Sequence, residues 1–250
     1  MPYLDKKVAI VTGASTGIGS GIASILAREG AKVVVNYNKS EKKATDVITN
    51  IQKQGGTAIA LRADVTSGDQ VKHMVDEAIK EFSKIDILVN NAGIARPNMF
   101  TKTTEDDWDA VMSVNLKGML LCTHAVIGHM LDRKSGNLIN ISSVAGKIGP
   151  VRNSIYSMTK AGIIGFTRSL ASEFSPYGIN VNCVAPGPVA GTVMFDSTPK
   201  DMVKQIINTL LVGRVGNIYE VGELVAYLAS ERASYITGQC LSIDGGRSMQ

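Results

Sequence analysis

Short apolar runs alternate with longer amphipathic segments along almost the whole chain. The short runs carry Val, Ile and Leu at consecutive positions, without the polar alternation of a half-exposed strand. Strands that are apolar on both faces are typical of a parallel sheet covered by helices on both sides. We therefore predict about seven strands, at Val8–Thr12, Lys32–Asn36, Thr57–Ala63, Ile85–Asn90, Gly136–Ile141, Asn180–Ala185 and Cys240–Ile243.

The longer segments between these strands have the spacing of amphipathic helices. They are Gly17–Glu29, Glu41–Gln54, Gly68–Phe82, Thr104–Leu131, Ser154–Phe174 and Tyr219–Ala229. Gly30, Gly55 and Gly178 fall just past three of them, where a left-handed cap is least costly for glycine. Thr104 and Asp107 have the spacing of a capping box in acidic form. The alternation predicts an α/β protein with a doubly wound parallel sheet.

The 250 residues contain no internal repeat and no linker-like run. We expect a single domain over residues 1–250, a length that suits one α/β domain. The least regular stretch is Pro186–Met202, directly after the end of a predicted strand. A surface loop is the simplest interpretation of its composition. Since ligands of open α/β sheets bind beyond the carboxyl ends of the strands, its position favours a mobile lid over a substrate.

Charge and cysteine content narrow the class of protein. The formal net charge is +4 and the basic residues are scattered, so we expect no nucleic-acid partner. Cys122, Cys183 and Cys240 lie far apart in apolar sequence without CxxC spacing, which indicates neither a zinc site nor a redox dithiol. Reduced thiols in a cytoplasmic protein fit this pattern best.

The chain shows no targeting or membrane signal that we recognise. Met1–Lys7 has lysines but no apolar core behind them, which is unlike a signal peptide. We find no stretch of consecutive apolar residues of the ~18 that crossing a bilayer requires. We therefore expect no membrane partner.

A glycine-rich turn, TGASTGIG at Thr12–Gly19, follows the first predicted strand. A helix starting near Gly17 directs unpaired N–H groups and the positive end of its dipole into this turn, where a pyrophosphate is stabilised. Glycines at these positions let the backbone approach the phosphates. The spacing is GxxxGxG, not the common dinucleotide fingerprint, so a purely structural turn is the alternative. The candidate cofactor residues here are Gly13, Ser15, Thr16, Gly17, Ile18 and Gly19.

The ends of the third and fourth predicted strands carry further candidates. Asp64, followed by Val65, is placed to accept from an adenine amino group, with a simple turn cap as the alternative. Asn91, Ala92 and Gly93 end the fourth strand, where small residues let the backbone lie against a ribose. Parallel strands end at one edge of a sheet, so these features converge on one site.

The residues at the end of the second predicted strand determine whether a cofactor with a 2′-phosphate can bind. An acidic residue at its end would bind both ribose hydroxyls and repel a 2′-phosphate. This chain has Asn36, Tyr37, Asn38, Lys39 and Ser40 instead. Lys39 and Ser40 are able to receive a 2′-phosphate, although Lys39 also fits a solvated surface position. We predict that NADP(H) is preferred and that NAD(H) remains possible.

Tyr156 and Lys160 have the spacing of one helical turn, and Ser143 precedes them at a strand end. A lysine four residues along a helix lies on the same face as the tyrosine, and its charge favours the phenolate. The phenol then serves as a general acid for reduction and a general base for oxidation. A serine hydroxyl beside it orients a carbonyl oxygen. A surface i,i+4 pair is the alternative, and Tyr3 and Lys7 have the same spacing with no pocket beside them.

The three histidines do not indicate a metal site. His73, His124 and His129 have no ligand spacing, because His124 and His129 diverge around a helix. We expect packing or surface positions for all three, and no metal.

The chain resembles the short-chain dehydrogenases/reductases over essentially its full length. The matching motifs are TGASTGIG, Asp64, NNAG at 90–93, Asn115, Ser143, Tyr156-x-x-x-Lys160 and Pro186-Gly187. The resemblance implies a Rossmann-type fold and a catalytic tetrad of Asn115, Ser143, Tyr156 and Lys160, in which Asn115 anchors a water relay and Lys160 also holds the nicotinamide ribose. It further implies that the nicotinamide side of the site is lined by six residues: Tyr156, Lys160, Pro186, Gly187, Val189 and Thr192. The resemblance also implies a homotetramer built through the long helices at 104–131 and 154–174.

These observations favour an oxidoreductase that transfers a hydride between NADP(H) and a carbonyl/alcohol pair. Within the family the chain looks most like 3-oxoacyl-carrier-protein reductases and bacterial glucose dehydrogenases. A 3-oxoacyl thioester or another ketone is the first hypothesis for the substrate. A sugar or polyol dehydrogenase is the second, and a dinucleotide-binding sensor without turnover is the third.

Overall fold

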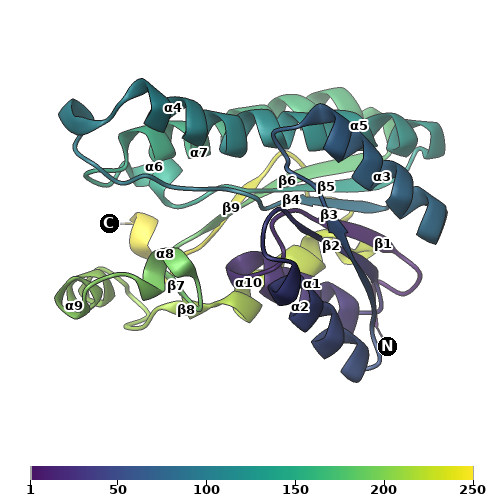
Figure 1. The fold of residues 1–250 in the computed structure, drawn as a ribbon, viewed down its shortest axis with the longest axis horizontal. Helices are drawn as coiled ribbons and strands as arrows, with labels where there is room; N and C mark the ends of the chain where they lie inside the picture. The colour runs from purple at the N-terminus through teal and green to yellow at the C-terminus, as the bar shows by residue number, and fades with distance from the viewer. Residues whose placement is uncertain (1, 250) are drawn as a thin grey trace.

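A seven-stranded parallel sheet forms the centre of the computed structural model, which describes residues 2–249 (Figure 1). The strand order is β3-β2-β1-β4-β5-β6-β9, so the sheet is doubly wound from β1 in the middle. The strands are β1 (Val8–Val11), β2 (Lys32–Tyr37), β3 (Thr57–Arg62), β4 (Ile87–Asn90), β5 (Gly136–Ile141), β6 (Ile179–Pro186) and β9 (Cys240–Ile243). All the strands predicted from the apolar runs are confirmed, with small shifts at their ends.

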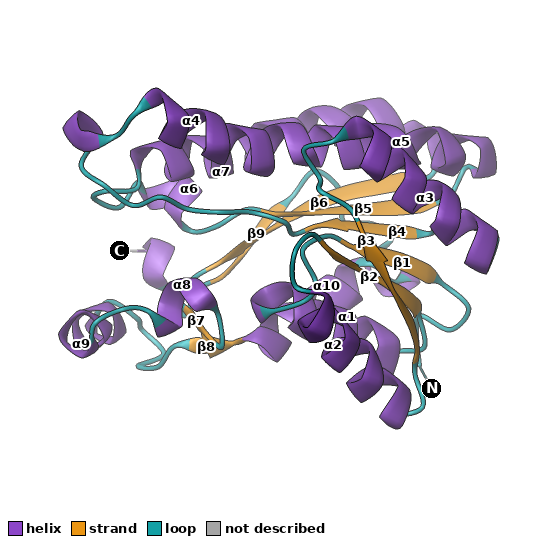
Figure 2. Ribbon diagram, in the orientation of Figure 1, coloured by secondary structure: helices purple, strands orange, loops and turns teal. Residues whose placement is uncertain are grey.

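Two layers of helices cover the two faces of the sheet (Figure 2). One layer contains α1 (Gly17–Arg28), α2 (Glu41–Lys53) and α10 (Ile218–Leu228); the other contains α3 (Gly68–Phe82), α5 (Gly118–Arg133) and α7 (Ser154–Phe174). Alternate residues of each strand enter opposite cores. Ala9 and Val11 pack in the core under α1, whereas Val8 and Ile10 pack in the core under α3. Burial on both faces is the physical reason for the unbroken apolar runs.

The helix predicted over 104–131 is interrupted in the structure. It consists of α4 (Glu105–Met112), a π-helical turn η2 (Ser113–Lys117) and α5, which continues to Arg133. The predicted capping box is confirmed, since Thr104 and Asp107 exchange side-chain and backbone hydrogen bonds at the start of α4. A π turn inserts one extra residue into a helix and is frequent at functional sites. Here it contains Asn115.

One helix bears on the expectation that the chain has no membrane segment. Within the described residues 2–249, the helix Glu105–Arg133 is long and apolar enough to cross a bilayer, with a mean hydropathy of 1.4 over its best window. Only 39% of that window is buried in the protein, yet Val126 and Met130 pack fully into the core. The helix is thus part of the layer that covers the sheet.

The segment after β6 is less irregular than the sequence indicated. It forms a short two-stranded sheet of β7 (Val189–Ala190) and β8 (Gly216–Asn217), with α8 (Val193–Asp196) and α9 (Lys200–Asn208) between them. These elements project beyond the carboxyl ends of the strands (Figure 1). The remaining short helices are α6 (Ala145–Ile148), η1 (Phe100–Lys102), η3 (Ser175–Tyr177), η4 (Glu231–Ala233) and η5 (Arg247–Met249). The predicted left-handed caps are confirmed, since Gly30, Gly55 and Gly178 have φ values of 94°, 82° and 78°.

Candidate active site

The glycine-rich turn between β1 and α1 leaves no room for side chains at its key positions. Gly13 and Gly17 have φ values of 61° and 57°, which disfavour other residues. A Cβ on Gly19 would lie 2.5 Å from both Asn91 Nδ2 and Gly13 O. The turn is therefore a narrow cradle of backbone, as an approaching pyrophosphate requires.

Two asparagines hold this turn in place from within the protein. Asn36 is 1% exposed, accepts from the Gly13 N–H (3.0 Å) and donates to the carbonyl oxygen of Ala63 (3.1 Å). Asn91 donates to the carbonyl oxygens of Thr12 (2.9 Å) and Gly13 (3.2 Å). Both were predicted to contact a cofactor. The Asn36 side chain and the Asn91 amide nitrogen make hydrogen bonds within the protein. We therefore assign both residues the role of holding the glycine-rich turn in place.

The first turn of α1 keeps its N–H groups free of side-chain caps, in contrast to α3, α4, α8 and α10. Thr16 occupies the N-cap position in extended backbone, and no side chain within residues 2–249 caps the helix there. Capping boxes close the starts of α4 and α10. Open N–H groups and the helix dipole at a glycine cradle together fit the pyrophosphate of a dinucleotide. Ser15, Thr16 and Ile18 lie in this turn, partly exposed.

The ends of β2 and β3 form the next part of the site. Asp64 accepts from the N–H (2.9 Å) and hydroxyl (2.7 Å) of Thr66, and both bonds hold the pKa of its carboxyl below the ordinary range. Its second oxygen accepts from Asn38 Nδ2 (2.9 Å). Asp64 is thus a turn cap that also fixes Asn38, while its contact with an adenine remains a prediction. Val65 is buried beneath it.

Arg62 is a candidate that sequence reasoning missed. The register of β2 and β3 places it opposite Tyr37, and its Nε donates to the carbonyl oxygen of Asn38 (3.1 Å). Arg62 and Lys39 are both exposed, and Ser40 lies beside them at the start of α2. Tyr37 differs from expectation, because its side chain is buried in the core. The sequence could have indicated Arg62 only if the pairing of β2 with β3 had been considered. Arg62 stands one position before the end of the predicted third strand, and the parallel pairing brings that position beside the end of the second strand.

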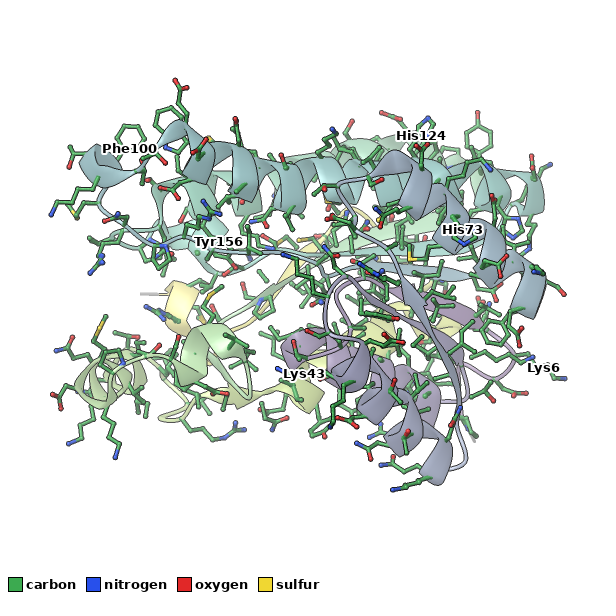
Figure 3. All side chains as sticks on the ribbon, in the orientation of Figure 1. Lys6, Lys43, His73, Phe100, His124 and Tyr156 are labelled. Carbon is green, nitrogen blue, oxygen red and sulfur yellow. The ribbon has the colours of Figure 1, made fainter. Side chains whose placement is uncertain are left out.

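The predicted catalytic side chains converge where β4 and β5 end. Tyr156 and Lys160 lie in α7, with the Lys160 ammonium 5.6 Å from the centre of the Tyr156 ring. The Ser143 hydroxyl accepts from the Ala145 N–H (3.1 Å), which fixes it at the start of α6, and its interaction with the Tyr156 phenol acts to lower the pKa of that phenol. Figure 3 shows Tyr156 between the upper helix layer and the sheet. The structure therefore brings Ser143, Tyr156 and Lys160 together.

Lys160 is the most deeply buried charge of the site. It is 3% exposed, and burial lowers the pKa of its ammonium to about 8. Its Nζ donates to the carbonyl oxygen of Ile141 (2.8 Å), while the Ser142 hydroxyl binds its backbone carbonyl (2.7 Å). A Cβ on Gly93 would lie 3.4 Å from this Nζ, so Gly93 keeps the space above it open.

Asn115 links the π turn to the loop after β4. Its Oδ1 accepts from the Ile94 N–H (2.8 Å), and its Nδ2 donates to the Ile94 carbonyl (3.0 Å) and to Thr159 Oγ1 (3.1 Å). The side chain is therefore committed to positioning the loop and α7. A Cβ on Gly93 would meet Asn115 Oδ1 at 3.3 Å, which places Asn115 and Lys160 around the same glycine.

The pKa of Tyr156 corrects one expectation. We predicted that the lysine charge lowers it, but burial raises the pKa of the phenol, and the hydrogen bond with Ser143 only opposes this in part. The physical reason is that Tyr156 loses water on folding while the Lys160 ammonium is bound to the Ile141 carbonyl. The phenol is accordingly protonated at neutral pH.

A cavity of about 280 Å³ lies at the start of α7, the helix that also carries Tyr156. Its lining is mainly apolar and comes from two loops and the start of α7: Met99, Phe100, Gly149, Pro150, Val151, Arg152, Ser154 and Ser157. Phe100 stacks on Trp108 at 5.9 Å between ring centres, which holds that wall in place. The loop containing Met99 and Phe100 and the loop at 149–152 thus meet at one cavity.

The segment after β6 closes the site from the other side. Pro186 and Val189 are buried, and a Cβ on Gly187 would lie 2.7 Å from Asp244 Cα. The Thr192 hydroxyl donates to the Val189 carbonyl (2.9 Å) and accepts from the Phe195 N–H (3.2 Å), so it caps α8. A Cβ on Gly17 would come within 3.5 Å of Thr192 Cγ2, which places the lid against the glycine-rich turn.

The histidines lie outside this arrangement. Figure 3 shows His73 and His124 at the end of the molecule away from Tyr156. His129 Nε2 accepts from the Ile85 N–H (3.2 Å), a structural bond. Among residues 2–249, no group of three or more His, Cys, Asp or Glu side chains is arranged to hold a metal ion.

The site combines a narrow glycine-rich turn at the N-terminus of a helix with a tyrosine, a serine and a buried lysine. This combination defines an oxidoreductase that acts on a carbonyl or alcohol group. The comparisons agree with this class. A family model described as enoyl-(acyl carrier protein) reductase matches residues 13–248. The chain therefore belongs to the short-chain dehydrogenase/reductase family.

Individual relatives match over the full length. A 3-oxoacyl-acyl-carrier-protein reductase of Synechocystis is 44% identical over 250 residues, covering 100% of both chains. The corresponding reductase of Staphylococcus aureus is 42% identical, covering 97% of this chain and 98% of the relative. A short-chain dehydrogenase/reductase from Serratia marcescens has a TM-score of 0.93 at 36% identity, covering 98% of this chain and 99% of that one.

Proposed function

We propose that this protein reduces the ketone of a 3-oxoacyl thioester with NADPH. The observation that carries the proposal is the grouping of Tyr156 with Ser143 and the buried Lys160, whose ammonium lies 5.6 Å from the centre of the Tyr156 ring. The relatives named as 3-oxoacyl-acyl-carrier-protein reductases support the substrate class, because their similarity extends over the whole chain.

The side chains suit reduction. A bound nicotinamide supplies the hydride in this chemistry. Ser143 holds the ketone oxygen, and Tyr156 donates its phenolic proton to that oxygen as negative charge develops there. Because burial raises the pKa of Tyr156, the proton is present on the donor at neutral pH. Lys160 is placed to hold the nicotinamide ribose and to return a proton to Tyr156.

The cavity at the start of α7 favours an acyl chain over a sugar. Met99, Phe100, Pro150 and Val151 provide apolar surface for an acyl chain, and the polar residues of the lining are Arg152, Ser154 and Ser157. Sugar hydroxyls buried against the apolar part of the wall would lack partners, which is unfavourable. We therefore rank a sugar or polyol dehydrogenase second, and a sensor without turnover third, since all members of the tetrad are present.

A substrate panel tests the proposal. NADPH oxidation is followed by absorbance with a 3-oxoacyl thioester, an enoyl thioester of the same chain length, and an aldehyde sugar. We expect the highest kcat/KM with the 3-oxoacyl thioester. A higher value with the enoyl thioester would instead support the reaction in the family model's description, and turnover of the sugar alone would support the second hypothesis.

The cofactor preference rests on the charges at the ends of β2 and β3. Within the described chain no acidic side chain lies at the end of β2, whereas Lys39 and Arg62 are exposed there. Arg62 is held beside Asn38 by its bond to that residue's carbonyl oxygen. Lys39 and Arg62 supply two exposed cations at the ribose position, while the nearby Asp64 carboxylate is occupied by Thr66 and Asn38, so we infer a preference for NADPH over NADH.

Replacing Arg62 or Lys39 with Ala tests this inference. Losing a charge-assisted hydrogen bond to phosphate costs about 1.5–3 kcal/mol, so we expect the KM for NADPH to rise about tenfold or more. The KM for NADH should stay unchanged, because NADH has no 2′-phosphate. Lys53→Ala, at the exposed far end of α2, is the matched control. Equal changes for both cofactors would contradict the assignment.

The family resemblance also leads us to propose a cytoplasmic homotetramer. Leu120 on α5 and Met158 on α7 are 46% and 50% exposed, so apolar surface remains uncovered on both long helices. A second copy of the chain would cover this surface.

A further inference from the structure

Cys183 and Cys240 are neighbours in space, although the sequence spacing gave no indication of a dithiol. The parallel register of β6 and β9 pairs them directly. Adjacent strands lie about 4.8 Å apart, within the Cα separation that a disulfide spans. Both side chains lie on the same face of the sheet, because both join the small cluster around Met119 and Ile163.

The two thiols differ in access. Cys183 is fully buried, whereas Cys240 is partly exposed on β9, the last strand at one edge of the sheet. Cys122 is 1% exposed on α5 and belongs to the larger core on that face. A reagent in solution therefore meets Cys240 first, and Cys183 is reachable only through Cys240.

The charges around Cys240 favour its thiolate. The neighbouring Cys183 thiol contributes most to lowering the pKa of Cys240 to about 7, and the Lys147 ammonium and Arg168 contribute in the same direction. Lys147 Nζ is fixed in place, donating to the Cys240 carbonyl (3.2 Å) and to Ser242 Oγ (2.8 Å). The neighbouring Cys240 and burial raise the pKa of Cys183, which keeps its proton and donates a hydrogen bond to the Val184 carbonyl (3.8 Å). Lowered pKa, positive surroundings and partial exposure are the properties of reactive cysteines.

We propose that Cys240 and Cys183 form a thiol-exchange site that is oxidised by small-molecule disulfides such as glutathione disulfide. The Cys240 thiolate attacks one sulfur of the reagent, the reagent's S–S bond breaks, and one thiolate leaves. Cys183 then loses its proton to a leaving thiolate and attacks Cys240 Sγ, which expels the second thiol. The protein loses two electrons as a Cys183–Cys240 disulfide forms, and the reagent is reduced to two thiols.

Mass spectrometry of the full-length protein tests the proposal. The protein is incubated with glutathione disulfide, remaining thiols are alkylated in acid, and peptides are analysed without reduction. In the wild type we expect a Cys183–Cys240 linked peptide while Cys122 stays reduced. In the Cys183→Ser variant we expect the reaction to stop at a stable glutathione adduct on Cys240. In the Cys240→Ser variant we expect neither this adduct nor the Cys183–Cys240 disulfide. Cys122→Ser is the matched control and should behave like the wild type.

Wild-type protein alone provides a second measurement. The rate of Cys240 alkylation by iodoacetamide should rise as pH passes through about 7, whereas an ordinary thiol shows this rise near pH ~8.5. An unmodified Cys240 in native wild-type protein would overturn the proposal. Modification of Cys122 before Cys240, or a Cys240 adduct in the wild type that Cys183 never resolves, would also overturn it.

Discussion

At the scale of single residues, burial acts in opposite senses on the two ionisable groups of the site. It raises the pKa of the Tyr156 phenol and lowers that of the Lys160 ammonium, because both are driven toward their neutral forms. A protonated phenol is a ready proton donor, whereas a lysine with a pKa of about 8 exchanges protons near neutrality. This arrangement suits carbonyl reduction more than alcohol oxidation, which needs the phenolate.

Tyr156→Phe should remove the proton donor and little else. We expect kcat to fall by about 10²- to 10⁴-fold, the usual contribution of a positioned general acid. The affinity for NADPH, measured by fluorescence titration, should stay close to that of the wild type, because the ring remains in place. Tyr177→Phe, at an exposed residue just past the same helix, is the matched control. Retained turnover in Tyr156→Phe would mean that another group donates the proton.

Lys160→Met should change how stability depends on pH. The pKa of Lys160 is about 8 in the folded protein against 10.5 for an ordinary lysine, so the unfolded chain binds more protons between these values. The free energy of unfolding of the wild type therefore rises with pH in this window, by up to about 3 kcal/mol relative to Lys160→Met. Urea titrations at pH 7 to 10.5 measure the difference.

Lys53→Met is the control for that experiment, because Lys53 is exposed at the end of α2. Its difference from the wild type should not vary with pH over the same window. A constant difference for Lys160→Met as well would show that the buried ammonium keeps an ordinary pKa.

The sequence identified chemistry at single residues better than it identified their surroundings. Ser143, Tyr156 and Lys160 were predictable because the spacing of residues on one helix, and the end of one strand, fix where they lie. Asn36 was misassigned because nothing local reveals that its side chain turns inward to Gly13 and Ala63. Arg62 was missed because only the pairing of β2 with β3 brings it to Asn38.

At the scale of elements, the glycine-rich turn depends on close backbone contact. Gly19→Ala would place a methyl group 2.5 Å from Gly13 O, in the first turn of α1. In an open helix this change stabilises, but here it must push the turn aside, at a cost of about 1–3 kcal/mol. We expect a lower melting temperature and weaker NADPH binding.

Gly68→Ala is the matched control for this change. Gly68 also begins a helix, and its added Cβ would make only an ordinary contact with Leu121 at 3.7 Å. It should leave NADPH binding unchanged and stabilise the protein by up to about 1 kcal/mol. If Gly19→Ala behaved in the same way, the cradle would be more open than the structure indicates.

The elements that sequence patterns missed are those that local periodicity does not determine. The π turn at Ser113–Lys117 keeps a helical pattern, and its extra residue is accommodated because Asn115 bonds to Ile94 and Thr159. The helices α8 and α9 contain no fully buried residue, so no strong apolar stripe marked them. In contrast, strands buried on both faces were recognised throughout, since their apolar runs are a direct consequence of two covering layers.

At the scale of the whole molecule, the long helix Glu105–Arg133 leaves apolar surface without cover. Its mean hydropathy reaches 1.4, but only 39% of that window is buried. Gly128 on α5 and Gly165 on α7 have no atom within 4 Å of an added Cβ, so another backbone has room to approach both helices. A lipid bilayer and a second copy of the chain are the two ways to cover such a face, and the expected tetramer favours the second.

Leu120→Arg distinguishes these two possibilities. We expect wild-type protein to sediment as a tetramer, and the variant to dissociate while its circular dichroism is retained, because an unpaired charge buried in an interface costs several kcal/mol. Asn50→Arg, exposed on α2 in the opposite layer, should leave the assembly intact. A monomeric wild type that floats with phospholipid vesicles would contradict the tetramer, because α5 would then meet lipid. A tetramer that tolerates Leu120→Arg would place the interface away from α5.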